Sequence, residues 1–125
     1  PELFARVCPG LSLPDILTAL EGAVEIFGRN RVSSNFILGL GETDECVRNG
    51  VETLAGMGVI PNLRPISPHP LRQGEIAVHR PTADRLIRLA RANQEALARH
   101  GLSATCSRTM CLPCTGCDLV PGIDL

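Results

Sequence analysis

The spacing of apolar residues along the chain predicts three amphipathic helices. In the first, apolar residues recur at helical intervals between Ser12, a suitable N-terminal cap, and Gly28. Thr43 and Thr82 are suitable N-terminal caps for a second and a third helix, and a glycine follows the end of each of these helices. The residues expected to face inward are Ile16, Leu17, Leu20, Val24 and Phe27 in the first helix, Val47, Val51, Leu54 and Met57 in the second, and Leu86, Ile87, Ala90 and Leu97 in the third. The arginines of the third helix are expected mostly on its outer side: Arg85, Arg88, Arg91 and Arg99.

Apolar runs between these helices predict short β-strands. The run Val32–Leu38 suits a strand that is covered on both faces. The run 59–66 contains Pro61 and Pro65, which donate no ladder hydrogen bond, so we expect a short or bulged strand there. Residues 102–105 are a candidate third strand. Strands that alternate with single helices are parallel with right-handed crossovers, which predicts an α/β fold, either an open doubly wound sheet or a (β/α) barrel.

Composition and charge narrow the class of partner. The 125 residues are 44% hydrophobic, enough for one core, but phenylalanine occurs three times and tryptophan and tyrosine do not occur. A net charge of -1 creates no field that would attract nucleic acid or anionic lipid. Apolar runs stay well below the ~20 residues of a membrane span, and the first ten residues lack the pattern of a secretory signal. We therefore expect a cytoplasmic protein that binds neither nucleic acid nor membranes.

Two glycines separate the first predicted strand from the second helix. Gly39 and Gly41 lie where backbone N–H groups at the start of a helix can face a ligand. A dinucleotide-binding turn would have a third glycine at position 44, but Asp44 stands there. Together with Glu42, this acid would repel a pyrophosphate. The alternative is a structural turn whose glycines permit a positive φ.

The run from Asn35 to Thr43 resembles a known motif. Its letters, N-F-I-L-G-L-G-E-T, are similar to the G-x-I-x-G-x-x-E motif on the fifth barrel strand of radical S-adenosylmethionine (SAM) enzymes, in the branch typified by biotin synthase. Ile37, Gly39 and Glu42 match the motif, whereas Asn35 replaces its first glycine. The resemblance implies that Ile37 packs on the adenine of SAM, and that Gly39 and Glu42 belong to the strand and turn that hold it.

The next strand and its loop carry the rest of the implied pocket. The resemblance implies that the strand around Asn62 contacts the cofactor through its backbone, and that side chains such as Asn62 and Arg64 face the substrate chamber. His69, in the following loop, is a further substrate candidate. Arg64 could equally form an ion pair at the barrel rim, and a lone loop histidine is more often solvated than catalytic. No catalytic residue is assigned.

The same resemblance implies a larger molecule. Residues 1–105 would form the C-terminal half of a (β/α) TIM-type barrel, and residues 106–125 a cysteine-rich, metal-binding tail. Two or three strands are few for a barrel, and the chain starts at Pro1 without a preceding strand, so we expect the N-terminal half of the same parent protein as its partner. The family's C-x3-C-x2-C loop, which binds the catalytic 4Fe-4S cluster, is not in the sequence. We expect that cluster upstream, and an inactive chain on its own.

Four cysteines near the C-terminus predict a metal centre. Cys111, Cys114 and Cys117 form a C-x2-C-x2-C run, and Cys106 precedes it by five residues. This spacing opens the bacterial ferredoxin signature, although Pro121 replaces the next cysteine. Four thiolates suit an auxiliary iron–sulfur cluster or a tetrahedral zinc, and disulfides are the alternative in an oxidising compartment. In a cytoplasmic protein we favour the iron–sulfur cluster.

These expectations combine into one function and one alternative. The chain is expected to be part of a radical SAM enzyme that cleaves SAM reductively to a 5′-deoxyadenosyl radical, which abstracts hydrogen from an unknown small-molecule substrate. A ferredoxin or flavodoxin is the expected reductant. The alternative is a non-catalytic zinc- or iron–sulfur-binding module whose glycine turn is structural.

Overall fold

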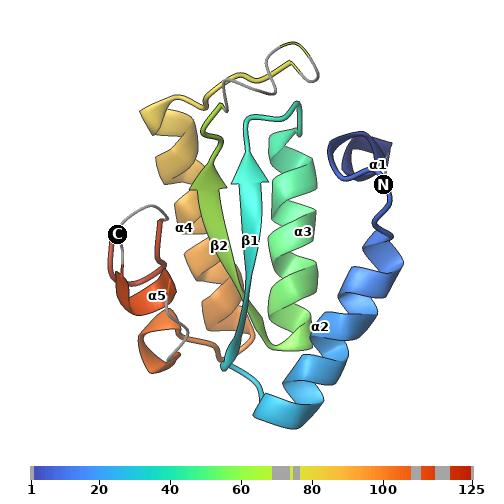
Figure 1. The fold of residues 1–125 in the computed structure, drawn as a ribbon. Coiled ribbons are helices and arrows are strands. Elements are labelled where there is room, and N and C mark those ends of the chain that lie inside the picture. The colour runs from blue at the N-terminus through green and yellow to red at the C-terminus, as the bar shows by residue number, and fades with distance from the viewer. Residues whose placement is uncertain (1, 69–73, 75–76, 108–110, 115–118, 125) are drawn as a thin grey trace.

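A parallel pair of strands forms the centre of the computed structural model, which describes residues 2–68, 74, 77–107, 111–114 and 119–124 (Figure 1). The strands β1 (Val32–Leu38) and β2 (Val59–Pro65) pair in parallel along their whole length. The predicted parallel pairing of the first two strands is therefore confirmed. The helices are α1 (Glu2–Val7), α2 (Leu13–Phe27), α3 (Asp44–Met57), α4 (Ala83–Arg99) and α5 (Cys111–Cys114), with a 3-10 helix, η2 (Ala104–Cys106), before α5.

The three predicted helices begin at their predicted caps. The side-chain oxygens of Ser12, Thr43 and Thr82 accept hydrogen bonds from the backbone N–H three residues later, at 3.4, 3.1 and 3.3 Å. Each bond satisfies one of the free N–H groups of a first helical turn. At the end of α3, Gly58 adopts a left-handed conformation, with φ 94°, that turns the chain directly into β2. Within the described part of the chain, no helix has both the length and the apolar character that a membrane crossing requires.

The two prolines of β2 do not interrupt its pairing with β1, because their nitrogen atoms face the opposite edge of the strand. The N–H of Ile66 donates to the carbonyl of Leu38 at 2.8 Å, so even-numbered residues of this segment direct their N–H groups toward β1. Pro61 and Pro65 are odd-numbered and direct their nitrogens to the opposite edge. The expected short or bulged strand is therefore not what forms: β2 has 7 residues and keeps one register with β1 throughout.

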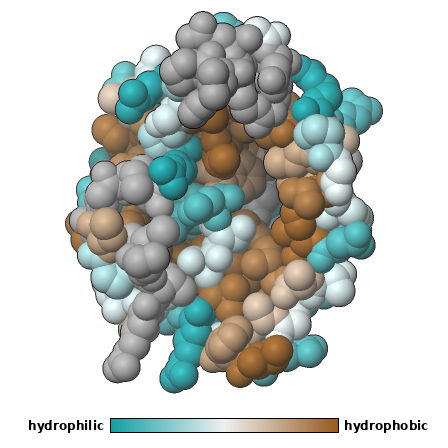
Figure 2. Space-filling model, viewed as in Figure 1, coloured by the Kyte–Doolittle hydropathy of each residue, from teal (hydrophilic) through white to brown (hydrophobic). Residues whose placement is uncertain are grey.

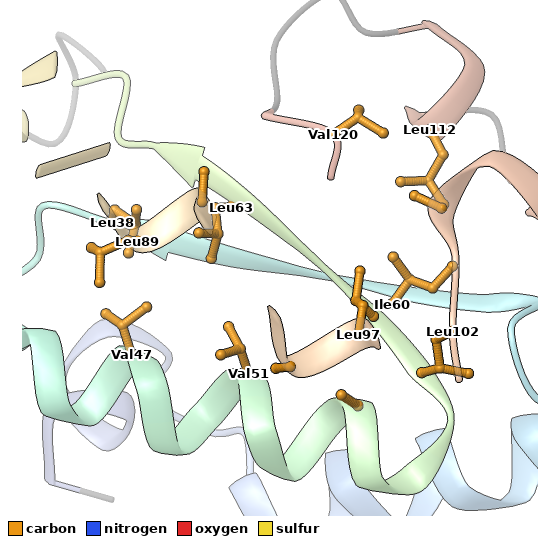
Figure 3. Packing of buried hydrophobic residues seen from close by; sticks show 14 residues of the cluster. Leu38, Val47, Val51, Ile60, Leu63, Leu89, Leu97, Leu102, Leu112 and Val120 are labelled. Atoms are coloured by element: carbon orange, nitrogen blue, oxygen red, sulfur yellow. The ribbon is translucent and has the colours of Figure 1, made fainter. Parts of the chain in front are cut away.

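The main core lies between one face of the sheet and helices α3 and α4 (Figure 3). Phe36 of β1 packs directly over Gly50 of α3, where a Cβ atom would overlap the phenylalanine ring. This close approach brings α3 onto the sheet, and α4 packs beside it. Large side chains that are fully buried here include Leu38, Leu63, Val47, Val51 and Leu89.

The C-terminal segment joins the same core. Leu112 of α5 and Val120 are almost completely buried in the cluster that contains the strand residues. The N–H of Leu119 donates to the carbonyl of Leu63 on the outer edge of β2, at 3.1 Å. The described part of the predicted tail therefore packs on the sheet, while the boundary at residue 106 stays a prediction.

The strand expected at 102–105 is not formed. The N–H of Leu102 donates to the carbonyl of Leu97 at 2.8 Å, which closes the end of α4. The next N–H, of Ser103, donates to Oδ1 of Asn30 at 2.7 Å. These two bonds hold the backbone at the end of the helix, and it continues into the 3-10 turn η2 instead of extending.

Some residues expected to face inward are exposed. Phe27 is 62% exposed because α2 covers only a corner of the sheet, and none of its residues is fully buried. On α4, Ile87 is 38% exposed, and Leu89 takes the buried position that the spacing did not assign. The spacing of apolar residues identifies the apolar face of a helix. Which residues of that face are buried depends on the neighbouring elements.

Candidate functional site

The face of the sheet opposite α3 and α4 carries the predicted site residues of both strands. Alternate strand residues point to opposite faces. Phe36 points toward α3, so Asn35 and Ile37 point to the other face. In the parallel register, Asn35 lies beside Asn62 and Ile37 lies beside Arg64. The tertiary structure thus brings together three of the residues assigned from the sequence: Ile37, Asn62 and Arg64.

The β1 part of this face is open among the described residues. Figure 1 looks onto the face, and there no described helix covers β1. Ile37 is 40% exposed and Asn35 is exposed. Figure 2 shows polar and apolar side chains next to one another across the middle of this view. The expectation that Val32–Leu38 is covered on both faces is therefore wrong for the described chain, because its helices cover only one face.

Asn62 is a buried amide with unused hydrogen-bonding capacity. Its side chain is completely buried, and neither Oδ1 nor Nδ2 has a partner among the described residues. Each unpaired group in such a position costs about 1–3 kcal/mol. An amide of this kind is suited to a polar group that brings both a donor and an acceptor.

Glu42 holds the turn that follows β1. Its Oε1 accepts a hydrogen bond from the N–H of Gly39 at 2.9 Å, and its Oε2 accepts one from the N–H of Leu40 at 2.8 Å. The side chain is only 3% exposed. The two carboxylate oxygens therefore bind the peptide groups that come directly after Leu38 and Gly39.

Gly39 is held from the opposite side by the loop that precedes α4. Its carbonyl accepts a hydrogen bond from the N–H of His79 at 2.9 Å. A Cβ atom on Gly39 would lie 2.6 Å from the carbonyl oxygen of His79, and the residue has φ 107°. Only glycine fits this conformation and this approach without strain. Gly39 is thus a backbone junction between the two loops at the carboxyl end of the sheet.

Arg85 of α4 completes the arrangement, and the sequence did not assign it. Its Nη1 and Nη2 donate to Oε1 and the backbone carbonyl of Glu42 at 3.0 and 2.9 Å, and its Nε donates to Oδ1 of Asp44 at 2.7 Å. The helical pattern placed Arg85 on the outer side of its helix, but its side chain is only 21% exposed. Several acidic side chains in one turn indicate that a positively charged side chain lies close to them. They do not indicate which arginine this is.

These contacts set the charge states of Glu42, Asp44 and Arg85. Burial raises the pKa of Glu42, but hydrogen bonds from the backbone N–H groups of Gly39, Glu42 and Leu40 and from Arg85 outweigh burial, so its pKa lies below the usual value. The hydrogen bond from Arg85 lowers the pKa of Asp44, and the same bond raises the pKa of Arg85. Both carboxylates are therefore ionised at neutral pH.

The predicted metal ligands are described only in part. Cys106 and Cys114 are exposed thiols outside any disulfide. Cys111 begins α5, but its side chain lies outside the described residues, as does the whole of Cys117. In the parts of the chain that are described, no three histidine, cysteine or acidic side chains form a group that could hold a metal ion. The four-thiolate centre stays a prediction, and the substrate candidate His69 also lies outside the described residues.

Comparison with known proteins gives partial support for a relationship to an enzyme. The chain is similar to bacteriochlorophyllide c C-7(1)-hydroxylase of Chlorobaculum limnaeum, with 38% identity over 74 residues. These residues cover 56% of this chain and 18% of the relative, so the chain spans less than a fifth of the relative's length. No family model and no solved structure matches the chain. The matched segment, at 74 residues, is much longer than the nine-residue motif, and it partly supports the resemblance to radical SAM enzymes.

Proposed function

We propose that this chain is the C-terminal portion of a radical SAM enzyme and completes its pocket for SAM and a small substrate. The observation that carries the proposal is the pair of hydrogen bonds from Gly39 and Leu40 to the carboxylate of Glu42. They fix the backbone that begins two residues after the exposed Ile37, the residue for which the resemblance implies adenine contact. The partial match to a hydroxylase adds support from outside the motif.

The described residues fit the chemistry of the proposed ligands. Ile37 offers a partly exposed apolar side chain near the carboxyl end of a parallel strand, which suits the flat face of a purine. Asn62 offers an amide that has no partner among the described residues, and Arg64, the candidate substrate contact, lies beside Ile37 on the same face. Once bound, SAM would supply a 5′-deoxyadenosyl radical that abstracts a hydrogen atom from the substrate.

The proposal assigns other tasks to other parts of the enzyme. The N-terminal half of the same barrel would bring the 4Fe-4S cluster and cover the open face of β1. A ferredoxin or flavodoxin would deliver the electron, and the four cysteines would hold an auxiliary iron–sulfur cluster or zinc. Hydroxylation, the reaction in the name of the matched relative, replaces a C–H bond. We therefore propose a small organic substrate in which a C–H bond is broken.

The test uses the full-length protein, purified without oxygen. With reductant and SAM, the wild type is expected to form 5′-deoxyadenosine, measured by liquid chromatography. Ile37→Ala is expected to weaken the Kd for SAM about tenfold, because it removes apolar contact worth about 1.4 kcal/mol. Ile123→Ala, a change at an exposed residue of the C-terminal segment, is the control and should leave the Kd unchanged.

Three results would contradict the proposal or a part of it. A wild-type protein that forms no 5′-deoxyadenosine is not a radical SAM enzyme, and colourless protein with one equivalent of zinc would favour the non-catalytic module. An unchanged Kd for SAM in Ile37→Ala would remove Ile37 from the pocket even if the enzyme is active.

A further inference from the structure

We infer that Arg85 is the positioning residue of the cofactor pocket, because it holds the carboxylate of Glu42 against the backbone that follows Ile37. The effect that we expect on SAM binding rests on the proposed function. The structural basis of the inference is independent: a guanidinium group from α4 joins a turn more than forty positions away in the sequence.

The guanidinium group of Arg85 donates to three acceptors. It donates to a carboxylate oxygen and the backbone carbonyl of Glu42, and to a carboxylate oxygen of Asp44. An arginine can serve three such acceptors through its rigid fork, whereas a lysine presents a single ammonium at the end of a flexible chain. The geometry therefore requires an arginine and not merely a positive charge.

Glu42 cannot hold the turn equally well without this partner. Oε1 accepts both from the N–H of Gly39 and from Arg85, so the arginine fixes the oxygen that binds the glycine. The carboxylate is almost completely buried, and removing one partner of a buried, charge-assisted pair leaves the other without full compensation. Loss of Arg85 should let Glu42 turn away toward water, which frees the N–H groups of Gly39 and Leu40.

Arg88 is a matched control on the same helix. It lies one turn further along α4, its side chain is 59% exposed, and its nearest acid is Asp44, at 3.7 Å. Among the described residues it has no hydrogen bond or ion pair with Glu42, so an Arg88→Met change removes a similar charge from a similar place without touching the turn. Arg85→Met keeps the apolar stem of the side chain, and Arg85→Lys keeps the charge.

The first measurement is hydrogen exchange of the full-length protein without SAM. In Arg85→Met, the amides of Gly39 and Leu40 are expected to exchange about tenfold faster, because their acceptor is no longer held. The amides in the middle of α4 should keep their rates, which shows that the helix is folded. Arg85→Lys should resemble Arg85→Met, and Arg88→Met should resemble the wild type.

The second measurement is the formation of 5′-deoxyadenosine at varied SAM concentration. Arg85→Met is expected to raise the KM for SAM about tenfold while kcat stays within about twofold, since the residue positions the binding backbone and does not touch the reacting atoms. A general loss of folded enzyme would instead lower kcat at unchanged KM.

The outcomes separate this inference from the proposed function. If the wild type forms 5′-deoxyadenosine but Arg85→Met keeps the wild-type KM, or if Arg85→Lys restores both measurements, the inference is overturned and the function stands. If the wild type forms none, the function fails and so does the consequence for SAM. Unchanged exchange at Gly39 and Leu40 would overturn the positioning itself in either case.

Discussion

Two glycines of the same turn obey different constraints at the scale of single residues. Gly39 and Gly41 both have positive φ, 107° and 105°. A Cβ atom on Gly39 would come within 2.6 Å of the carbonyl oxygen of His79, whereas one on Gly41 would meet open space. A larger residue would therefore strain the backbone to a similar degree at both positions. At position 39 it would also clash with the carbonyl oxygen of His79.

Alanine at these two positions should separate the two effects. We expect Gly41→Ala to lower the free energy of unfolding by about 1 kcal/mol through backbone strain alone. Gly39→Ala should lower it by about 3 kcal/mol, because the neighbouring loop must also move. Urea unfolding of the purified protein, followed by circular dichroism, measures both. Equal losses in the two variants would show that the loop carrying His79 moves away at no cost.

The carboxyl end of the sheet is assembled from pieces of three elements. The turn after β1 supplies Gly39 and Glu42, the loop before α4 supplies His79, and the first turn of α4 supplies Arg85. The cap at Thr82 fixes where α4 begins and hence where Arg85 points. One carboxylate, that of Glu42, connects the first and last of these pieces.

Acid should weaken this connection between elements. Because the pKa of Glu42 in the folded protein lies below its usual value of 4.5, its contribution is complete above that pH and is lost as the pH falls through the lower, folded pKa. We expect Glu42→Gln to be less stable at neutral pH and to lose less stability on acidification than the wild type does. Thermal unfolding at a series of pH values measures the slope.

A neighbouring acid provides the control for this titration. Glu45 is exposed in the first turn of α3, so Glu45→Gln makes the same change of charge close by without altering the contacts of Glu42. If Glu42→Gln lost stability toward acid as steeply as the wild type, the titration of Glu42 would not be the cause.

At the scale of the whole molecule, the C-terminal segment packs in the same core as the sheet and its helices. Leu112 and Val120 lie in the cluster that also contains Leu63 and Leu89, although Leu112 is separated from Leu63 by α4 in the sequence. Figure 3 shows the two C-terminal residues on the core side of their segment. The segment with the predicted metal ligands is thus anchored to the sheet by apolar packing.

A core substitution in this segment should therefore destabilise the whole chain. Leu112→Ala is expected to lower the free energy of unfolding by about 2–5 kcal/mol, the cost of a cavity at a fully buried leucine. Pro113→Ala, at the exposed neighbouring position, should change it by less than about 0.5 kcal/mol. Urea unfolding monitored by circular dichroism provides the comparison. A Leu112→Ala variant as stable as the wild type would show that the segment unfolds separately.

Helix starts and the motif could be predicted from particular residues, because their causes are local. Thr43 caps the N–H three residues later, and Glu42 binds the N–H groups of Gly39 and Leu40 a few atoms away. Long-range choices could not be predicted. The outer position expected for Arg85 was wrong, since its partners lie on another element, and the strand expected at 102–105 was wrong, since Asn30 captures the N–H of Ser103.

By itself the sequence determined the three long helices α2, α3 and α4, the two strands and the turn between β1 and α3, because apolar spacing, caps and glycines act within a few residues. Only the tertiary structure decided which strand edge the prolines face, that Ile37 shares a face with Asn62 and Arg64, and that one arginine of α4 holds Glu42. Burial and partnership between distant residues depend on how the elements pack, and packing depends on the summed shape and charge of all of them.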